Sequence, residues 1–465
     1  MPKPKARPTQ TKVKHTILQD YLQAWGGIIL SGLRGAAARR GSVSSEAHFV
    51  YVDCDAYRGR FDGELDDVKA GRPVVTVYGS PLIGIRSLDA LIPRAAQFGI
   101  SLRTNVILFE KKLQDFEILH QTLQNAGFAD RIVLDSDFPK LQNGQIALIN
   151  GDSTTWGAKL IQFTQKSAMT YSFFFLDPYG PRGIPLSFVR RIIEKQHHDV
   201  IINMPYRDLH KKTGLLTKAN LTPDQAQRLQ DYNAMFGHDK WQTLISHIDM
   251  DAVWGSIDES AEVDNEDEEI EDVAIPLSLA PVDAVRLASA RERELQLMQC
   301  YQESLERVDP TLVVKSIGLH YPAVQQTMFY LYLTTHDPTG GLTMNKVLSD
   351  ANLQEQDLRW KLRTTIDTTR KGYAGTLFDL PAPTTAPIKR TVPKIIADEI
   401  VEQLGGSQLL LRQIYRSFTN TLYFDTEIVS ALNILRKAGM AQWEGKGKLT
   451  NRTVITILRS LSEPT

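Results

Sequence analysis

Five short apolar runs that alternate with helical segments constrain the fold of this chain more than any other feature. The runs are HFVYVD (48–53), TNVILFE (104–110), IALING (146–151), YSFFFLD (171–177) and DVIINM (199–204). Helical patterns start near Leu113 and extend from Ser187 to Lys195. Strands that are apolar along their whole length, separated by helices, are typical of a parallel sheet covered on both faces. The sequence therefore predicts an α/β fold with a mostly parallel sheet.

Two further strand-like runs follow, TLVVKSI (311–317) and MFYLYLTT (328–335). The segment between them is too short for a crossover helix of ordinary length, which a parallel connection requires. We therefore expect these two runs to pair antiparallel at one edge of the sheet.

The first residues of the chain have a different composition. Residues 1–14 carry five cations and prolines but no acidic residue, which is typical of a flexible basic arm. From about His15 to Leu33, apolar residues recur at helical spacing, so a helix is expected to lead into the first domain. Trp25, on the apolar face of this helix, is expected in the core.

Length, charge and cysteine content exclude several classes of protein. A chain of 465 residues exceeds one ordinary hydrophobic core and predicts two or three domains. A formal net charge of −1 argues against a surface that binds polyanions everywhere, so any contact with nucleic acid must be local. Cys54 and Cys300 form no disulfide or metal-ligand pattern, which fits structural thiols in a reducing cytoplasm. No run of about 18 apolar residues occurs, so we predict a cytoplasmic protein without membrane spans.

Two polar stretches suggest domain boundaries. We assign residues 15–350 to the first domain, although the acidic stretch 256–274 contains no Lys or Arg and predicts a solvated linker or insertion. This stretch has neither EF-hand spacing nor a glycine turn, so no metal site is predicted there. Residues 351–393 are expected to form a helical connector that ends in a linker rich in proline and threonine.

The last segment, residues 394–465, has the pattern of a small separate domain. Three helical patterns, at about 394–404, 408–418 and 425–438, precede two strand-like runs around a Gly-Lys-Gly-Lys turn within 441–458. Three helices followed by a β-hairpin predict a winged helix-turn-helix domain. Its cations Lys446, Lys448 and Arg452 lie in the predicted wing and could contact phosphates. Its third helix, by contrast, begins with acidic residues, so we expect weak and non-selective DNA binding.

Four acidic residues stand where the predicted parallel strands end: Asp53, Glu110, Asp152 and Asp177. Open α/β sheets bind their ligands outside this edge. A carboxylate after the second strand can accept hydrogen bonds from ribose hydroxyls, and one after the third can contact an adenine amino group. Glu110 and Asp152 would fit a nucleoside-containing cofactor in this way. The alternative for each residue is a carboxylate that caps the next helix.

The most specific of these signals is LDPYGPRGIP (176–185). Asp177, Pro178 and Tyr179 would present a carboxylate, a carbonyl and an aromatic ring at the mouth of the site. Methyltransferases that act on the amino groups of bases use such a loop, in which polar atoms accept amino hydrogens and the ring stacks on the extruded base. The alternative is a proline-stiffened turn in which Tyr179 only packs.

The chain resembles the three-Cys-motif partner family (TcmP), a bacterial group with a class I, S-adenosylmethionine-dependent methyltransferase-like domain. The matching stretches are KHTILQDYLQAW (14–25), YVDCDAYRGRFDGE (51–64), GSPLIGI (79–85), VILFE (106–110), FFFLDPYGPRGIP (173–185), VIINM (200–204), MFGHDKW (235–241) and MFYLYLTTHDPTGG (328–341). Residues 419–445 are similar to the winged helix that many members append. The resemblance implies a class I methyltransferase-like fold and S-adenosylmethionine as the cofactor.

One loop departs from this family pattern. At positions 53–61 the family typically has Asp-Gly-Phe-Ala-Gly-Pro-Gly-Arg-Tyr, whereas Cys54, Tyr57 and Arg58 replace Gly, Gly and Pro in this chain. Glycine allows positive φ and a close approach of the backbone to a ligand. We therefore expect the Tyr57 side chain to crowd the methionine and ribose portions of the cofactor.

The leading hypothesis is a methyltransferase-like protein that uses S-adenosylmethionine and acts on or with nucleic acid. Asp53, Gly59, Glu110 and Asp152 would hold the cofactor, while the loop at 177–179 would orient the acceptor. A second hypothesis is a catalytically degenerate fold that serves as an assembly subunit, for which the resemblance implies a three-Cys-motif partner similar to radical S-adenosylmethionine enzymes. A third is a winged-helix DNA-binding regulator.

Overall fold

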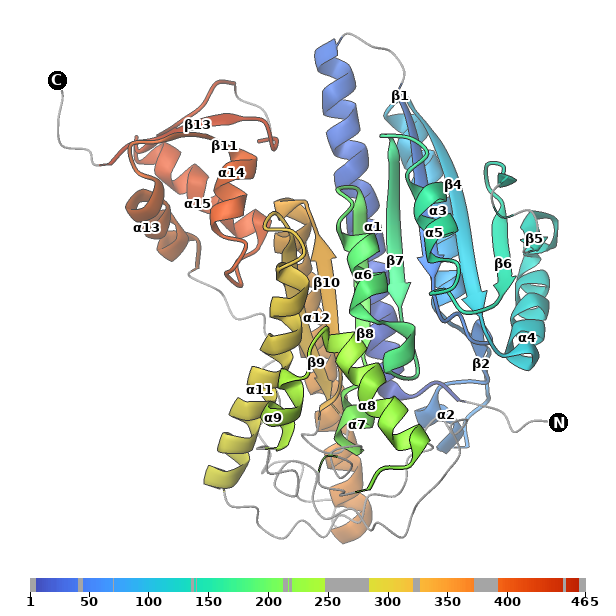
Figure 1. Ribbon diagram of the computed structural model, residues 1–465. Coiled ribbons are helices and arrows are strands. Elements are labelled where there is room, and N and C mark those ends of the chain that lie inside the picture. The colour runs from blue at the N-terminus through green and yellow to red at the C-terminus, as the bar shows by residue number, and fades with distance from the viewer. Residues whose placement is uncertain are drawn as a thin grey trace.

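The structure is a computed structural model, in which a large α/β domain carries a small domain at its C-terminal end (Figure 1). It describes residues 6–40, 45–69, 71–134, 138, 140–211, 216, 220–246, 284–320, 327–371, 392–445 and 449–459. The acidic stretch 256–274, most of the linker at 379–393, and Lys446 and Lys448 lie outside the described residues. Predictions that concern them stay predictions.

The large domain is built on an eight-stranded sheet with the order β5-β6-β4-β1-β7-β8-β10-β9. Its strands are β1 (Ser45–Asp53), β4 (Ile100–Glu110), β5 (Ile132–Leu134), β6 (Ile146–Asn150), β7 (Thr170–Leu176), β8 (His198–Met204), β9 (Val313–His320) and β10 (Thr327–Thr335). All neighbours from β5 to β8 are parallel. Strand β10 pairs antiparallel with both β8 and β9. The predicted α/β fold, its mostly parallel sheet and its antiparallel edge pair are confirmed.

Alternate residues of the central strands face two separate cores. On one face, Phe49 and Tyr51 of β1 belong to a core with helices α1 (Thr9–Arg40), α3 (Ser80–Gln97), α4 (Leu113–Leu123) and α12 (Pro338–Lys371). On the other, Val50 and Val52 belong to a core with α5 (Gly157–Thr164), α6 (Leu186–Ile193), α7 (Tyr206–Lys211), α8 (Pro223–Phe236), α9 (Lys240–Ser246) and α11 (Ala284–Glu306). A sheet buried on both faces requires apolar residues at successive positions, which explains the continuous apolar runs of the sequence.

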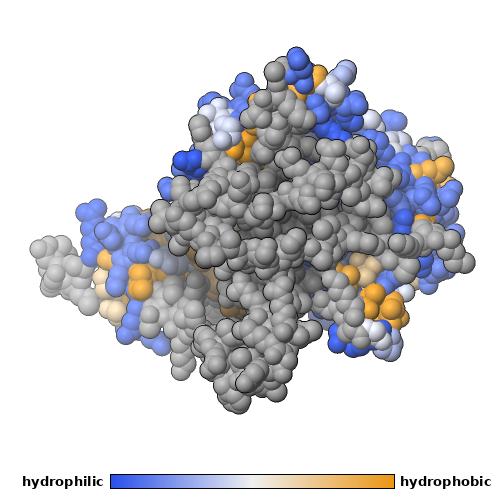
Figure 2. Space-filling model, turned by 90° about the horizontal axis from the view of Figure 1, so that it is seen from below, coloured by the Kyte–Doolittle hydropathy of each residue, from blue (hydrophilic) through white to orange (hydrophobic). Residues whose placement is uncertain are grey.

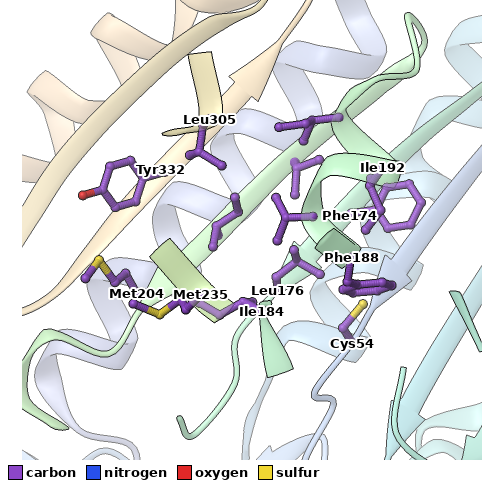
Figure 3. Close-up of a cluster of buried hydrophobic side chains, with 14 of the residues drawn as sticks. Cys54, Phe174, Leu176, Ile184, Phe188, Ile192, Met204, Met235, Leu305 and Tyr332 are labelled. Carbon is purple, nitrogen blue, oxygen red and sulfur yellow. The ribbon is translucent and has the colours of Figure 1, made fainter. Parts of the chain in front are cut away.

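Figure 3 shows part of the second core. Side chains of β7, among them Phe174 and Leu176, lie among Phe188 of α6, Met235 of α8 and other apolar residues. Cys54 belongs to this core and is only 3% exposed. Burial raises the pKa of its thiol well above the usual value, and the nearby Asp55 carboxylate adds to this. Cys54 and Cys300 are both free thiols, and Cys54 packs as a small apolar side chain.

The predicted start of the first helix is wrong by several residues. Helix α1 has 32 residues and begins at Thr9, so the second half of the predicted basic arm is helical. Val13 is buried, and the cations Arg7 and Lys14 pair with Glu64 and Asp177, which lie far along the chain. Local composition could not reveal these partners. Trp25, 3% exposed, lies in the core as predicted.

The predicted boundary near residue 350 falls inside a helix. Helix α12 runs for 34 residues, from Pro338 to Lys371, and thereby joins the large domain to the predicted connector.

The small domain contains α13 (Val392–Leu404), β11 (Gln408–Leu410), α14 (Leu411–Ser417), α15 (Asp425–Lys437), β12 (Ala441–Gln442) and β13 (Val454–Ile457). Its three strands form a sheet in the order β11-β13-β12. The helical pattern predicted at 408–418 therefore begins as a strand, because β11 pairs with β13 from the end of the chain. Tertiary pairing overrides local periodicity there.

The small domain is held to the large one by buried polar contacts. Asn345 of α12 donates to the carbonyl oxygens of Thr421 (3.0 Å) and Tyr423 (2.8 Å), just before α15. Lys315 of β9 donates to the same Thr421 oxygen at 2.9 Å. Leu342 of α12 belongs to the apolar core of the small domain. The turn between α14 and α15 is therefore docked on the large domain.

The remaining elements are short. A ribbon of β2 (Arg60–Phe61) and β3 (Val77–Tyr78) follows β1 and encloses α2 (Leu65–Lys69). A π turn (Gln124–Phe128) and two 3-10 turns (Ala129–Arg131 and Pro181–Gly183) complete the described elements. Among the helices described, none is long and apolar enough to cross a membrane.

Candidate functional site

The loop after β1 keeps a glycine-like backbone although it contains a tyrosine. Tyr57 has a φ of 49°, and no other non-glycine residue of the described segments has positive φ. Gly59 has a φ of 65°. A Cβ atom at position 59 would lie 2.7 Å from Leu119 Cδ1, and the Gly59 carbonyl accepts a hydrogen bond from the Gly79 amide at 2.9 Å. Glycine is thus required at position 59, whereas Tyr57 is held in a left-handed conformation that costs about 1 kcal/mol.

The Tyr57 ring lies at the mouth of the predicted site. It meets the Tyr179 ring edge-on, with 6.2 Å between centroids, and the Arg58 guanidinium carbon lies 5.1 Å from its centroid. Arg58 also donates from Nε to Asp115 Oδ1 at 2.5 Å. Tyr57 and Arg58 therefore contact each other and residues outside the loop, and these contacts hold the backbone of the loop.

Asp53, at the end of β1, is fully buried. Its carboxylate accepts hydrogen bonds from the Tyr51 hydroxyl (3.2 Å) and the Asp55 amide (3.4 Å). Burial raises the pKa of Asp53 to about 7, the Asp177 carboxylate contributes, and the hydrogen bonds only limit the shift. A nearby positive charge would favour the ionised form of this group.

The sequence reasoning missed Asp55, which lies in the loop directly after β1. Its Oδ2 atom is buried and has no hydrogen-bond partner among the described residues. Burial raises the pKa of Asp55 well above the usual value, and four carboxylates add to the shift: Asp177, Asp53, Glu110 and Asp152. The four acidic residues that were predicted from the sequence thus all act on the Asp55 carboxylate. Their places at the ends of parallel strands are consistent with this proximity.

Glu110 and Asp152 each form hydrogen bonds within the loop that follows their strand. Glu110 Oε1 accepts a hydrogen bond from the Lys112 amide at 2.8 Å, and burial raises the pKa of Glu110. Asp152 Oδ1 accepts from the amide (3.0 Å) and hydroxyl (2.6 Å) of Thr154. Burial acts to raise the pKa of Asp152, but these bonds and the Lys111 ammonium outweigh it and lower the pKa. Both carboxylates thus hold the loop that follows their strand, but neither caps the next helix, because α4 and α5 begin without a side-chain cap hydrogen bond.

Asp177 is bound by two residues that the sequence reasoning missed. The Lys14 ammonium donates to both carboxylate oxygens, at 2.8 and 2.6 Å, and Asn203 Nδ2 donates to Oδ1 at 2.6 Å. Lys14 comes from α1 and Asn203 from β8. Asn203 could have been predicted only from its place in an apolar strand, because a polar residue in such a strand is expected to be buried.

The other two residues of the Asp177 loop differ in exposure. Pro178 is buried and packs close to Gly183, where a Cβ atom would lie 2.5 Å from Pro178 Cβ. The Tyr179 side chain is 53% exposed, and the Lys112 ammonium lies 5.6 Å from its ring centroid. Figure 2 shows the molecule from below, where the coloured residues around the margin of the view are mostly hydrophilic and the apolar ones form small separate groups.

Of the three cations predicted to bind nucleic acid, the structure describes only Arg452. Arg452 is exposed in the turn before β13. The first turn of α15 carries Asp425 and Glu427, as expected, and the preceding loop is docked on α12.

A shallow cavity of about 60 Å³ lies at the opposite, amino edge of the sheet, with Trp25 and His197 in its lining. Asp199 in its wall accepts from the Tyr21 hydroxyl (3.0 Å) and the Thr335 hydroxyl (3.1 Å), so both its oxygens are used internally. We place the candidate site at the carboxyl edge, where Asp55 Oδ2 and Asn203 Oδ1 are buried without a hydrogen-bond partner among the described residues. Among the residues that the structure describes, no group of His, Cys, Asp and Glu is arranged to hold a metal ion.

Comparisons with known proteins give little. No family model matches the chain, and no curated protein matches it. One solved structure with some likeness is a protein from Legionella pneumophila, strain Philadelphia 1, described by the family model DUF519. It aligns with a TM-score of 0.28 and 10% identity, over 68% of this chain and 85% of that one. A likeness of this size supports no conclusion about fold or function.

Proposed function

We propose that the large domain is a class I methyltransferase-like domain that binds S-adenosylmethionine. Strand β1 is central, with β4 and β6 on one side and β7 and β8 on the other, followed by the antiparallel β10. Class I methyltransferases share this strand arrangement. The resemblance to the three-Cys-motif partner family rests on the same segments and remains part of the proposal.

One observation carries the proposal: Asp53 and Asp177 follow the two strands that flank the switch point of the sheet. The chain leaves β1 toward β4 on one side and later crosses to β7 on the other, so the strand order reverses between β1 and β7. Ligands of open α/β sheets bind in the crevice at such a point. Besides burial, the Asp177 carboxylate acts to raise the pKa of Asp53, which indicates that the two groups share one environment.

The charges of the site fit the cofactor. Asp53 and Asp55 have raised pKa values, and Asp55 Oδ2 lacks a partner among the described residues, so a cation would stabilise both. S-adenosylmethionine carries a sulfonium and an ammonium group, and when bound it supplies an activated methyl group. Asp53, Gly59, Glu110 and Asp152 would hold it. The contribution of the protein would be alignment of the acceptor with that group.

Calorimetric titration of the full chain with S-adenosylmethionine tests this proposal. We expect binding that weakens at least about tenfold in Glu110→Ala, which corresponds to about 1.4 kcal/mol. Glu117→Ala, an exposed glutamate of α4, is the matched control and should bind as the wild type does. If Glu110→Ala binds the cofactor as tightly as the wild type, the site assignment is wrong.

The acceptor is proposed to belong to nucleic acid. The exposed Tyr179 ring, beside the Lys112 ammonium, offers a stacking face next to a cation. The small domain, which we propose to be a winged helix, supplies three helices and a three-stranded sheet beside the large domain. Asp177→Ala should abolish methyl transfer to an oligonucleotide while the affinity for the cofactor changes little.

A second function is favoured by the Tyr57 contacts. A side chain that fills the glycine position, and is fixed there by Arg58 and Tyr179, suits a fold that binds a partner without turnover. The chain would then be an assembly subunit for a three-Cys-motif protein similar to radical S-adenosylmethionine enzymes. Failure of the wild type to bind the cofactor, with binding in Tyr57→Gly, Arg58→Pro, would favour this function.

A further inference from the structure

The ammonium of Lys14 is enclosed by groups from several elements of the large domain. Lys14 is 7% exposed, and its Nζ lies 5.2 Å from the ring centroid of Phe329 on β10. The same atom contacts both oxygens of Asp177, after β7. Carboxylate oxygens together with an aromatic face are a typical environment for a bound ammonium group.

Asn203 adds an unused hydrogen-bond acceptor to this environment. The residue is 6% exposed, and its Oδ1 atom is buried without a hydrogen-bond partner among the described residues. Its orientation is determined, because only the Nδ2 end can face Asp177 Oδ1 at 2.6 Å without repulsion between two oxygens. A buried acceptor without a donor destabilises the folded state, because it has lost its hydrogen bond to water and gained none in return. Such a cost is explained if a ligand supplies the donor.

The polar atoms around Lys14 Nζ therefore match a group with several N–H donors. Both Asp177 oxygens can only accept hydrogen bonds, and the unpaired Oδ1 atom of Asn203 is also an acceptor. Besides burial, the Asp177 carboxylate acts to raise the pKa of Asp53 and of Asp55, so positive charge is favoured at this place. A primary ammonium group satisfies both requirements, a neutral primary amino group satisfies the first, and a carbonyl or a phosphate satisfies neither.

We propose that Asp177, Asn203 and Phe329 form a subsite for a primary amino group, which the chain's own Lys14 fills until a ligand displaces it. This inference rests on the proposed function in one respect: the ligand is taken to be the methyl acceptor, which accordingly carries an amino group. The first turns of α1 then act as an internal competitor of the acceptor. The subsite binds and orients, and Lys14 takes no part in a covalent step.

Chemical rescue of the full-length Lys14→Ala variant tests the subsite without cofactor or nucleic acid. The substitution removes the side chain beyond Cβ, and n-butylammonium has the same four-carbon stem and ammonium charge as a complete lysine side chain. We expect 10 mM n-butylammonium chloride to raise the Tm of Lys14→Ala by about 1–3 °C and that of the wild type by less than 0.5 °C. Differential scanning calorimetry measures both.

Four controls make the rescue specific. Lys12→Ala removes the same charge from the same helix, where Lys12 lies 3.8 Å from Glu64, and it should show no shift. Tetramethylammonium, which has no N–H donor, and n-butanol, which has no charge, should not stabilise Lys14→Ala. Adding Asn203→Leu to Lys14→Ala should abolish most of the n-butylammonium shift. If Lys14→Ala does not fold, Lys14→Met retains the stem and is tested with methylammonium.

The outcomes are distinct. An equal shift in Lys12→Ala, an equal shift with tetramethylammonium, or no shift at all overturns the subsite. An undiminished shift with Asn203→Leu removes Asn203 from it. A specific amine shift in a chain that fails to bind S-adenosylmethionine supports the subsite and rejects the proposed methyltransferase function, and the converse result rejects only the subsite.

Discussion

The rings of Tyr57 and Tyr179 meet edge-on at 6.2 Å and thereby join the loop after β1 to the loop after β7. The two loops are the predicted cofactor loop and the predicted acceptor loop. Because Tyr57 has a φ of 49°, this contact depends on a backbone conformation that glycine adopts more easily. Removing the ring should therefore open the site and relieve strain together.

The first prediction follows from this contact. Tyr57→Gly should increase the affinity for S-adenosylhomocysteine at least about fivefold, while the free energy of unfolding changes by less than about 1 kcal/mol, because relieved strain offsets lost packing. Calorimetric titration and urea unfolding measure the two quantities. Tyr57→Asn tolerates the left-handed conformation and also lacks the large ring, so it should behave similarly. Unchanged affinity in both variants would show that the ring lies outside the ligand's path.

The second prediction concerns the pH dependence due to Asp53. Its pKa is about 7 in the folded chain and about 3.8 when unfolded, so the folded state binds more protons between these values. The stability that this group contributes is therefore lost as the pH rises from about 4 to about 7. Asp53→Asn should be more stable than the wild type at pH 8, by about 2–4 kcal/mol, and the difference should vanish near pH 4. Urea unfolding at both pH values measures this difference.

Asp53 also provides a functional readout. If it binds a cationic ligand, the affinity of the wild type for S-adenosylmethionine should increase as the pH rises through about 7, and Asp53→Asn should lack this increase. The neutral thioether S-adenosylhomocysteine is the matched ligand. A parallel pH profile for both ligands would contradict a role for the Asp53 charge in holding the sulfonium group.

The third prediction concerns the contact between the two domains. Asn345→Ala removes this donor from the partly buried carbonyls of Thr421 and Tyr423, of which the Thr421 oxygen keeps Lys315, and should destabilise the docked arrangement by about 1–3 kcal/mol. Lys346→Ala is the matched control, because Lys346 forms only an exposed pair with Asp350 one turn away. Calorimetry should resolve a lower or separate transition in Asn345→Ala alone. Coincident melting curves would mean that apolar contacts such as those of Leu342 dominate the docking.

The fourth prediction concerns DNA. The full chain should bind duplex DNA weakly and without sequence preference, since α15 begins with Asp425 and Glu427 and the loop before it is docked. Binding should weaken further with added salt and in Arg452→Ala. Fluorescence anisotropy over a salt series measures both effects. Tight and sequence-selective binding at physiological salt would instead favour a transcriptional regulator.

Local periodicity predicted the strands well because each central strand of a doubly covered sheet must be apolar along its length. It also predicted that Asp53, Glu110, Asp152 and Asp177 would gather, since parallel strands end at one edge. The strand β11 was missed because its partner β13 lies at the end of the chain.

The parts of the site contributed by distant segments could not be predicted. Lys14 is paired with a residue 163 positions away, and the role of Asn203 depends on the side chain of Asp177. Composition placed Lys14 in a flexible arm, because its neighbours in sequence carry no acid to pair with. Asp55 was overlooked for a related reason: its burial arises from the packing of a loop, which no periodicity records.

The edge pair of the sheet has a consequence for biosynthesis. Strand β8 ends at Met204, but its partner β10 begins only at Thr327, and the α12 face that covers α1 follows later still. During translation the backbone groups along one side of β8 and part of the apolar face of α1 therefore emerge long before the segments that cover them. Open strand edges and uncovered apolar faces promote association between nascent chains. A chaperone bound to these surfaces during synthesis should therefore raise the yield of folded protein, whereas slower synthesis, which prolongs their exposure, should lower it.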